Sequence, residues 1–207
     1  MTKNHRLHDI IFLSKEVIIM IILASSSPRR AKLLKDAGIN FIVESSDIKE
    51  EFNPLDKPED IVVNLAQQKA QAVSKNHHDD IIIAADTIVV YQNEILGKPV
   101  DEEDAYRMLK MLSSEVHQVY TGVCLQKGDK IKSFCSKTAV KMKKLSDLEI
   151  RGYIQTHEPM DKAGAYGIQG LGGALVESYQ GDFFTIVGLP LKDLLAALNE
   201  FINETQS

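Results

Sequence analysis

Residues 17–30 read Val-Ile-Ile-Met-Ile-Ile-Leu-Ala-Ser-Ser-Ser-Pro-Arg-Arg, an aliphatic run that passes directly into a helix start. The part up to Leu23 is typical of a strand that is covered on both faces. Ser27 before Pro28 predicts the helix start, because a serine side chain caps free N–H groups and proline lacks an N–H that would be unpaired there. Gly38 supplies the left-handed residue with which such a helix ends. The stretch therefore predicts a strand followed at once by a helix.

The junction between this strand and helix also has the composition of a phosphate site. The free N–H groups and about half a positive charge at a helix start attract anions. Ser25, Ser26 and Ser27 add hydroxyl groups, and the guanidinium groups of Arg29 and Arg30 match phosphate oxygens in bidentate geometry. The segment predicts a phosphate cradle. The alternative is an ordinary capped helix with two solvated arginines.

A second strand-like stretch, residues 81–90, contains one carboxylate and one hydroxyl among aliphatic residues, those of Asp86 and Thr87. A bare carboxylate in such a place is unfavourable unless it is paired, hydrogen-bonded or bound to a metal. Buried acids of this kind serve metal-assisted hydrolysis. We therefore interpret Asp86 as a functional residue. The alternative is a structural acid that caps a nearby loop.

The remaining predicted elements alternate between strands and helices. Prolines at helix starts, acidic first turns, a Gly128-Asp129 hairpin turn and a Ser146–Glu149 capping box mark their boundaries. The expected elements are a strand at 41–45, an acidic loop, helices at 58–75 and 101–112, strands at 116–126 and 131–142, a helix after Ser146, a glycine-rich loop at 162–173, a hairpin, and a final helix from Pro190. This order indicates an α/β domain.

Two further polar side chains stand at informative positions. Lys69 lies on or beside the buried stripe of the helix at 58–75, so it either acts as a ligand or extends its ammonium past the edge of the core. The glycines of residues 162–173 let the backbone approach a ligand closely, and the amide of Gln169 is able to read the edge of a base. The alternative for this loop is a mobile surface connection.

Composition limits the class of protein. The chain has 207 residues, of which 44% are hydrophobic and 26% are charged, and these fractions are typical of a globular domain. A formal net charge of −5 argues against a protein that coats nucleic acid. Cys124 and Cys135 lack metal-ligand spacing, so we expect both as reduced thiols.

The first 19 residues superficially resemble a secretory signal. Lys15 and Glu16 interrupt their apolar stretch, and the uninterrupted run at 17–24 is far shorter than the roughly 20 residues that span a bilayer. We therefore predict an N-terminal extension at 1–19, with Met20 as an alternative start, followed by a single domain at 20–207. The expected location is the cytoplasm, with neither a membrane nor a nucleic acid as a partner.

Six short motifs together resemble the Maf family of nucleoside triphosphate pyrophosphatases, which are also described as septum-formation inhibitors. The motifs are Ala24-Ser-Ser-Ser-Pro-Arg-Arg30, Lys69-Ala70, Ala84-Ala-Asp-Thr87, Gly97-Lys-Pro99, Asp161-Lys-Ala-Gly-Ala-Tyr-Gly-Ile-Gln-Gly170 and Val187-Gly-Leu-Pro190. The resemblance covers about residues 20–203. It implies an elongated α/β fold like that of inosine-triphosphate pyrophosphatases, with a mixed sheet flanked by helices, two lobes, and the active site in a central cleft.

The resemblance also implies roles for individual residues. Asp86 matches the general base of the family, and Glu50 matches an acidic position that would hold magnesium or manganese together with Asp86. Glu51 and Asp47 are alternatives to Glu50, and it stays open whether Asp86 accepts a proton or mainly holds the metal. The implied assembly is a homodimer. The residues that would hold the phosphate chain of the substrate are Ser25, Arg29, Arg30, Lys69 and Lys98.

Arg29, Thr87 and Gln169 resemble the branch of the family that hydrolyses dTTP and UTP to the monophosphate and pyrophosphate. An amide pairs with the carbonyl and N3–H edge that thymine and uracil share, whereas cytosine presents an amino group and a bare N3 there. One alternative is another substrate, such as a methylated GTP or a noncanonical purine triphosphate. Another is a regulator of cell division that senses nucleotides. The complete set of acids and cations favours an enzyme, because a sensor has no need of a buried base.

Overall fold

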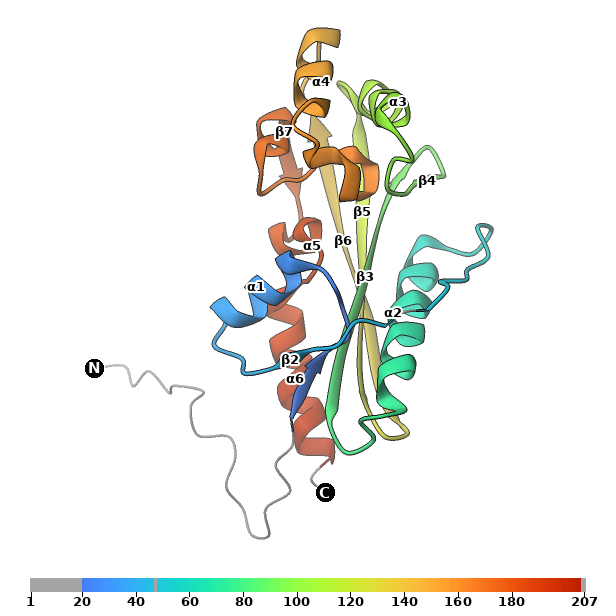
Figure 1. Ribbon diagram of the computed structural model, residues 1–207, viewed down its shortest axis with the longest axis vertical. Coiled ribbons are helices and arrows are strands. Elements are labelled where there is room, and N and C mark those ends of the chain that lie inside the picture. The colour runs from blue at the N-terminus through green and yellow to red at the C-terminus, as the bar shows by residue number, and fades with distance from the viewer. Residues whose placement is uncertain (1–19, 47, 206–207) are drawn as a thin grey trace, which may run out of the picture.

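The computed structural model describes residues 20–46 and 48–205. Across them the chain forms an elongated seven-stranded mixed sheet with helices on both faces (Figure 1). The N-terminal extension predicted at 1–19 lies outside the described residues, as does Asp47. Within the described part of the chain, no helix is both long and apolar enough to cross a membrane. The predicted α/β architecture is confirmed.

The strands and helices follow the predicted alternation. The sheet consists of β1 (Ile21–Leu23), β2 (Ile42–Val43), β3 (Ile81–Tyr91), β4 (Glu94–Leu96), β5 (Val116–Lys127), β6 (Lys130–Met142) and β7 (Val176–Gln180). The α-helices are α1 (Pro28–Asp36), α2 (Pro58–Ser74), α3 (Glu102–Leu112), α4 (Asp147–Ile154), α5 (Phe183–Val187) and α6 (Leu191–Thr205). Three short 3-10 helices follow α4: η2 (Glu158–Asp161), η3 (Ala163–Ala165) and η4 (Leu171–Leu175).

Parallel and antiparallel pairing occupy different parts of the sheet. β1 pairs parallel with β2 and with β3, whereas β3, β5, β6 and β7 pair antiparallel in that order and β4 adds to β3. β1 ends at Leu23, opposite Ile83, but β3 continues to Tyr91. Open α/β sheets bind ligands beyond the carboxyl ends of their parallel strands. The residues that follow β1 therefore meet the middle of β3 where a ligand site is expected.

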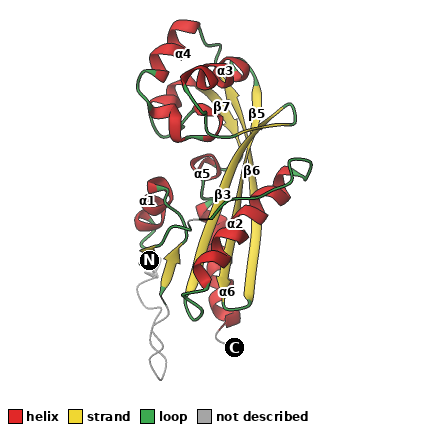
Figure 2. Ribbon diagram, turned by 45° about the vertical axis from the view of Figure 1, so that its right-hand side comes forward, coloured by secondary structure: helices red, strands yellow, loops and turns green. Residues whose placement is uncertain are grey.

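Side chains of β3 point alternately into two hydrophobic layers. Ile82 and Ala84 pack with α2 on one face, and Ile83 packs with α1 and α6 on the other (Figure 2). A third hydrophobic layer, built largely by α3, α4 and their neighbouring strands, surrounds the far end of the sheet. By the same alternation, Asp86 belongs to the face covered by α2, and Thr87 belongs to the opposite face.

Local signals in the sequence account for several boundaries. Gly128 has a positive φ in the turn between β5 and β6, and Ser146 with Glu149 forms the predicted capping box of α4. The register of β5 and β6 places Cys124 and Cys135 diagonally, and both thiols are free. These predictions are confirmed.

Two local predictions are confirmed only in part, and a third is wrong. Ser27 is the N-cap of α1, but its side chain makes no capping hydrogen bond, and its N–H donates to Ser25 Oγ at 3.3 Å. The strand expected at 41–45 is limited to Ile42–Val43. In place of the hairpin expected after the glycine-rich loop, β7 pairs with β6 and α5 follows, because Asp182 caps this helix by accepting the N–H of Thr185.

Candidate active site

A cleft of about 930 Å³ lies where the chain leaves β1 and passes β3. Cavities that bury small-molecule ligands have volumes of roughly 300–1,000 Å³, so the cleft has room for a nucleotide. Folding brings together here nine of the residues that the sequence singled out, although they come from distant segments. They are Ser25, Arg29, Arg30, Glu50, Lys69, Asp86, Thr87, Lys98 and Gln169.

An ammonium group between two carboxylates occupies one side of the cleft. Lys69 Nζ pairs with Asp86 Oδ1 and lies 3.0 Å from Glu50 Oε1. The side chains of Lys69 and Asp86 are 12% and 13% exposed, whereas that of Glu50 is 45% exposed. The pair forms because α2 covers the face of β3 to which Asp86 points. Lys69 therefore keeps its ammonium inside the cleft as the counter-charge of a buried acid, and does not extend it into solvent.

Arg30 is held on three sides by groups of the protein. Its Nε donates to Gly188 O at 2.7 Å, and its terminal nitrogens donate to Ser25 Oγ and Thr87 Oγ1, each at 3.1 Å. Burial lowers the pKa of Arg30, an effect that the Asp86 carboxylate partly offsets, and the guanidinium stays charged at neutral pH. These bonds fix the orientation of the group and leave its other N–H groups for an anionic ligand.

Thr87 lines the cleft, and its hydroxyl is bound to neighbouring side chains. Thr121 Oγ1 donates to Thr185 O at 2.8 Å. Because a hydroxyl carries a single proton, Thr87 must be the donor in its 2.9 Å bond with Thr121, and it accepts the bond from Arg30. The hydroxyl of Thr87 is thus engaged on both sides. Thr87 therefore helps to fix the position of Arg30.

Three of the predicted residues lie at more open positions of the cleft. Arg29 donates to Asp161 Oδ2 in η2 at 3.1 Å, and its side chain is 32% exposed. Lys98 and Gln169 are exposed. Within residues 20–46 and 48–205, neither of these two side chains makes a hydrogen bond or ion pair. Both are therefore free to meet a substrate.

The two carboxylates fit a hard divalent cation. Asp86 and Glu50 converge on one point, the ammonium of Lys69, and magnesium is usually held by one or two carboxylates together with substrate phosphates. Of the alternatives to Glu50, the Glu51 side chain is 77% exposed and does not line the cleft, and Asp47 lies outside the described residues. No group of three or more acids, histidines or cysteines among the described residues could hold a metal. A bound cation would therefore also need oxygens of the substrate.

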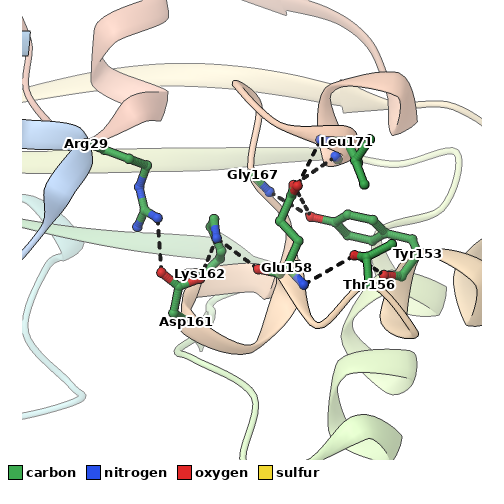
Figure 3. A network of polar contacts seen from close by, with 9 residues as sticks. Arg29, Tyr153, Thr156, Glu158, Asp161, Lys162, Gly167 and Leu171 are labelled. Carbon is green, nitrogen blue, oxygen red and sulfur yellow. Dashed lines mark hydrogen bonds and ion pairs between the residues drawn. The ribbon is translucent and has the colours of Figure 1, made fainter. Parts of the chain in front are cut away.

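The residues that hold the glycine-rich loop could not be identified from the sequence. Glu158 in η2 and Tyr153 in α4 make hydrogen bonds to the backbone of this loop (Figure 3). The only signal was the run of glycines itself, which indicates a close neighbour without identifying it. His117 was also missed: it is buried in β5, and its Nε2 lies 2.8 Å from the hydroxyl of Tyr166, a residue that lines the cleft.

Comparison with known proteins shows which family and which fold the chain resembles. The family described as Maf-like protein matches residues 20–201 of the chain. The dTTP/UTP pyrophosphatase of Bacillus cereus (strain ZK / E33L) is 48% identical over 181 residues, which cover 87% of this chain and 95% of the relative. A protein of the same name from Bacillus anthracis (strain CDC 684 / NRRL 3495) is 46% identical with the same coverage. A solved HAM1 protein from Coxiella burnetii has a TM-score of 0.53 at 16% identity, over 88% of this chain and 100% of that chain, and thus shares the fold.

Proposed function

The chain belongs to the Maf-like protein family, and from this we propose that it is a nucleoside triphosphate pyrophosphatase that hydrolyses dTTP and UTP to the monophosphate and pyrophosphate. The relatives named dTTP/UTP pyrophosphatase are 46–48% identical to the chain over 95% of their own length. The observation that carries the proposal is the gathering of Arg30, Lys69 and Asp86 in one cleft. Cations for a phosphate chain thereby lie beside a buried carboxylate.

Positive charge along the cleft supports binding of a phosphate chain. Arg30 is already oriented by three hydrogen bonds, so its remaining N–H groups meet an anion without loss of side-chain freedom. Arg29 and Lys98 add positive charge, and Ser25 adds a hydroxyl shortly before α1. Hydrolysis of a phosphoanhydride depends mainly on positioning and on stabilisation of charge, and fixed cations provide both.

Asp86 is the residue assigned to the attacking water. Its contact with Lys69 uses Oδ1, which leaves Oδ2 to accept a proton from water or to bind a metal. A divalent cation held by Asp86, Glu50 and the substrate would polarise the phosphate and orient the water. Water then adds across the bond between the α and β phosphates, and pyrophosphate leaves. Lys69 balances the negative charge of the Asp86 carboxylate until this group accepts a proton.

Gln169 is the residue assigned to the base. Its amide offers an acceptor and two donors, which match the carbonyl and N3–H of thymine and uracil. With the amide held in this orientation, cytosine would place its amino group against the amide NH2 group and its bare N3 against the amide oxygen. Buried polar groups left without partners cost about 1–3 kcal/mol, which corresponds to roughly five- to more than a hundredfold discrimination.

The test measures pyrophosphate release from dTTP, UTP, CTP, dCTP, GTP and ITP, in the native chain and in Gln169→Leu. We expect the highest kcat/KM for dTTP and UTP, and a flattened ranking in the leucine variant. Preference for CTP or a purine contradicts the proposed substrates, and an unchanged ranking in Gln169→Leu contradicts the role of Gln169. Tight nucleotide binding without turnover would instead favour the nucleotide-sensing alternative.

The homodimer that the resemblance implies and the cytoplasmic location that we expect from the sequence are further parts of the proposal. Sedimentation equilibrium on the full chain distinguishes a dimer from a monomer at micromolar concentration. Cell fractionation tests the location, which we expect because nucleoside triphosphate pools are cytoplasmic.

A further inference from the structure

The glycine-rich loop folds around a single carboxylate, that of Glu158 (Figure 3). Its Oε1 accepts the N–H of Gly172 at 3.0 Å and the hydroxyl of Tyr153 at 2.9 Å, and its Oε2 accepts the N–H of Leu171 at 2.9 Å. The Tyr153 oxygen in turn accepts the N–H of Gly167 at 3.1 Å. Both ends of the segment 167–172 are therefore tied, directly or through one phenol, to Glu158.

The glycines of the loop stand where these two side chains approach it most closely. A Cβ atom at position 170 would lie 2.4 Å from Glu158 Oε2, and one at position 172 would lie 2.5 Å from the Tyr153 oxygen. Both distances are shorter than any ordinary contact of a Cβ atom. The composition of the loop thus reflects close packing on Glu158 and Tyr153, and the loop is not the mobile surface connection that was the alternative interpretation.

The charge states of Glu158 and Tyr153 agree with the hydrogen bonds that they make. Burial alone would raise the pKa of the Glu158 carboxyl, but the N–H groups of Gly172 and Leu171 together with the Tyr153 hydroxyl hold this pKa below its ordinary value. Burial raises the pKa of the Tyr153 phenol, which therefore stays neutral and donates. Hydrogen bonds to an ionised acceptor are about twice as strong as those between neutral groups. Glu158 is thus a firm anchor for the loop.

Gln169 lies in the middle of the anchored segment. Its side chain lines the same cleft as Glu158 and makes no hydrogen bond to other described residues. The direction of its amide therefore depends on the backbone around it, which is fixed on one side at Gly167 and on the other at Leu171 and Gly172.

We propose that Glu158 is a positioning residue for base selectivity: its carboxylate fixes residues 167–172 so that the Gln169 amide faces the base of the substrate. The proposal rests on the proposed function. A purely structural role would lower stability, and activity on all nucleotides, together. A positioning role changes the choice between bases and leaves recognition of the phosphate chain intact.

The principal variant is Glu158→Gln, which keeps the shape of the side chain. An amide has one acceptor oxygen, so its NH2 group must face either the N–H of Leu171 or the donors at the other oxygen. We expect the ratio of kcat/KM for UTP over CTP to fall by about tenfold. The inhibition constant of tripolyphosphate, which has no base, should stay within about twofold of that of the native chain.

A second variant, Tyr153→Phe, covers the case in which Glu158→Gln does not fold. It keeps the buried ring and removes the hydroxyl that joins Glu158 to Gly167, so the same ratio should fall. Glu177→Gln is the matched control, since this carboxylate is exposed on β7 and does not line the cleft. The double variant of Glu158→Gln with Gln169→Leu should show the ratio of Gln169→Leu alone, because both changes act through one amide.

The outcomes separate the two proposals. If the native chain hydrolyses none of the nucleotides, or lacks a preference for UTP over CTP, the proposed function is wrong and the inference falls with it. If the native chain prefers UTP and a folded Glu158→Gln or Tyr153→Phe variant keeps that ratio within twofold, only the inference is wrong. Additive losses in the double variant would also overturn it.

Discussion

Among single side chains, the proposed reaction depends most directly on the carboxylate of Asp86. Asp86→Asn keeps the size of the side chain but removes its charge, so the variant neither accepts a proton nor balances Lys69. We expect kcat/KM to fall by at least about a hundredfold, the lower end of the effect of losing a general base or metal ligand. Pyrophosphate release measures the loss, and thermal melting checks that the variant is folded. Asp79→Asn is the control, because the side chain of Asp79 is 88% exposed. Activity near that of the native chain would contradict the assigned role.

His117 makes folding sensitive to acid. Burial lowers the pKa of this histidine to about 4, whereas an unfolded chain has a histidine pKa near 6.5. Between these values the unfolded state binds a proton that the native state does not, so the free energy of unfolding decreases as pH falls. At pH 4 the free energy of unfolding should be about 3 kcal/mol lower than at neutral pH. Well below pH 4, protonation of His117 should lower it no further.

Urea denaturation between pH 4 and pH 7.5 measures this effect in the native chain and in His117→Gln. The variant should lose most of the decrease, whereas His78→Gln, at a side chain that is 75% exposed, should keep it. The same pH dependence in His117→Gln would show that other groups cause it.

His77 acts in the opposite direction: burial lowers its pKa, but hydrogen bonds to Glu44 and Asp80 raise it above its ordinary value. Its contribution is therefore present at low pH and is lost as pH rises through that raised pKa.

The roles of residues with unusual local chemistry were predictable from the sequence. The roles of residues that depend on partners distant in the sequence were not. Asp86 stood out as an acid inside an aliphatic strand, and Lys69 stood out as a lysine on the apolar face of a helix. The environment of Thr87 was not predictable, because its hydroxyl is engaged by Arg30 and by Thr121, which lie far away in the sequence. Only the fold brings Arg30 of α1 and Thr121 of β5 to the face of the sheet to which Thr87 points.

At the scale of helices and strands, α5 shows why the predicted hairpin was wrong. Phe183-Phe-Thr-Ile-Val187 is rich in residues that favour strands. Asp182 nevertheless caps the first turn, and Gly188 ends the helix with φ +108°. The Gly188 carbonyl then accepts the bond from Arg30. The capping residues at both ends of α5 and a tertiary contact outweigh the preference of these residues for strands. The long strands were predictable because their hydrophobic pattern and the turn residues between them indicated the same structure.

The packing of α2 against β5 depends on Gly122, which pairs with Asp86 across the sheet. A Cβ atom at Gly122 would lie 2.2 Å from the backbone oxygen of Val62 in α2, so the helix would have to move away. We expect Gly122→Ala to lower the free energy of unfolding by about 1–3 kcal/mol, the usual effect of overpacking. Because α2 carries Lys69, kcat/KM should fall as well. Urea denaturation and pyrophosphate release measure the two effects.

Gly152→Ala is the matched control for this packing. Gly152 lies inside α4, and a Cβ atom there would meet no atom within 4 Å. Alanine should stabilise the chain by about 0.5–1 kcal/mol, because it lowers the conformational entropy of the unfolded chain. Equal stability changes in the two variants would contradict the close contact between α2 and β5.

For the molecule as a whole, we propose that residues 20–207 contain the complete catalytic domain. β3, β5 and β6 run along the length of the sheet (Figure 1). The backbone of Met20 is hydrogen-bonded to Asp80 and Ile81 just before β1. A chain that begins at Met20 should therefore melt within a few degrees of the full chain and keep its kcat/KM within about twofold. Strong destabilisation would show that residues before Met20 contribute to the core.

The ion pair between Arg29 and Asp161 joins α1 to η2 and therefore links distant parts of the chain around the cleft. A substrate phosphate that binds Arg29 has to compete with the Asp161 carboxylate. Asp161→Asn removes this competitor, so KM for UTP should fall by about two- to fivefold while kcat stays unchanged, because partly exposed pairs contribute up to about 1 kcal/mol. The difference should shrink at high salt, where such charges are screened. Asp36→Asn, which breaks the exposed Lys32–Asp36 pair at the other end of α1, should leave KM unchanged. A rise in KM for Asp161→Asn would show that the carboxylate aims Arg29 at the substrate and does not compete for it.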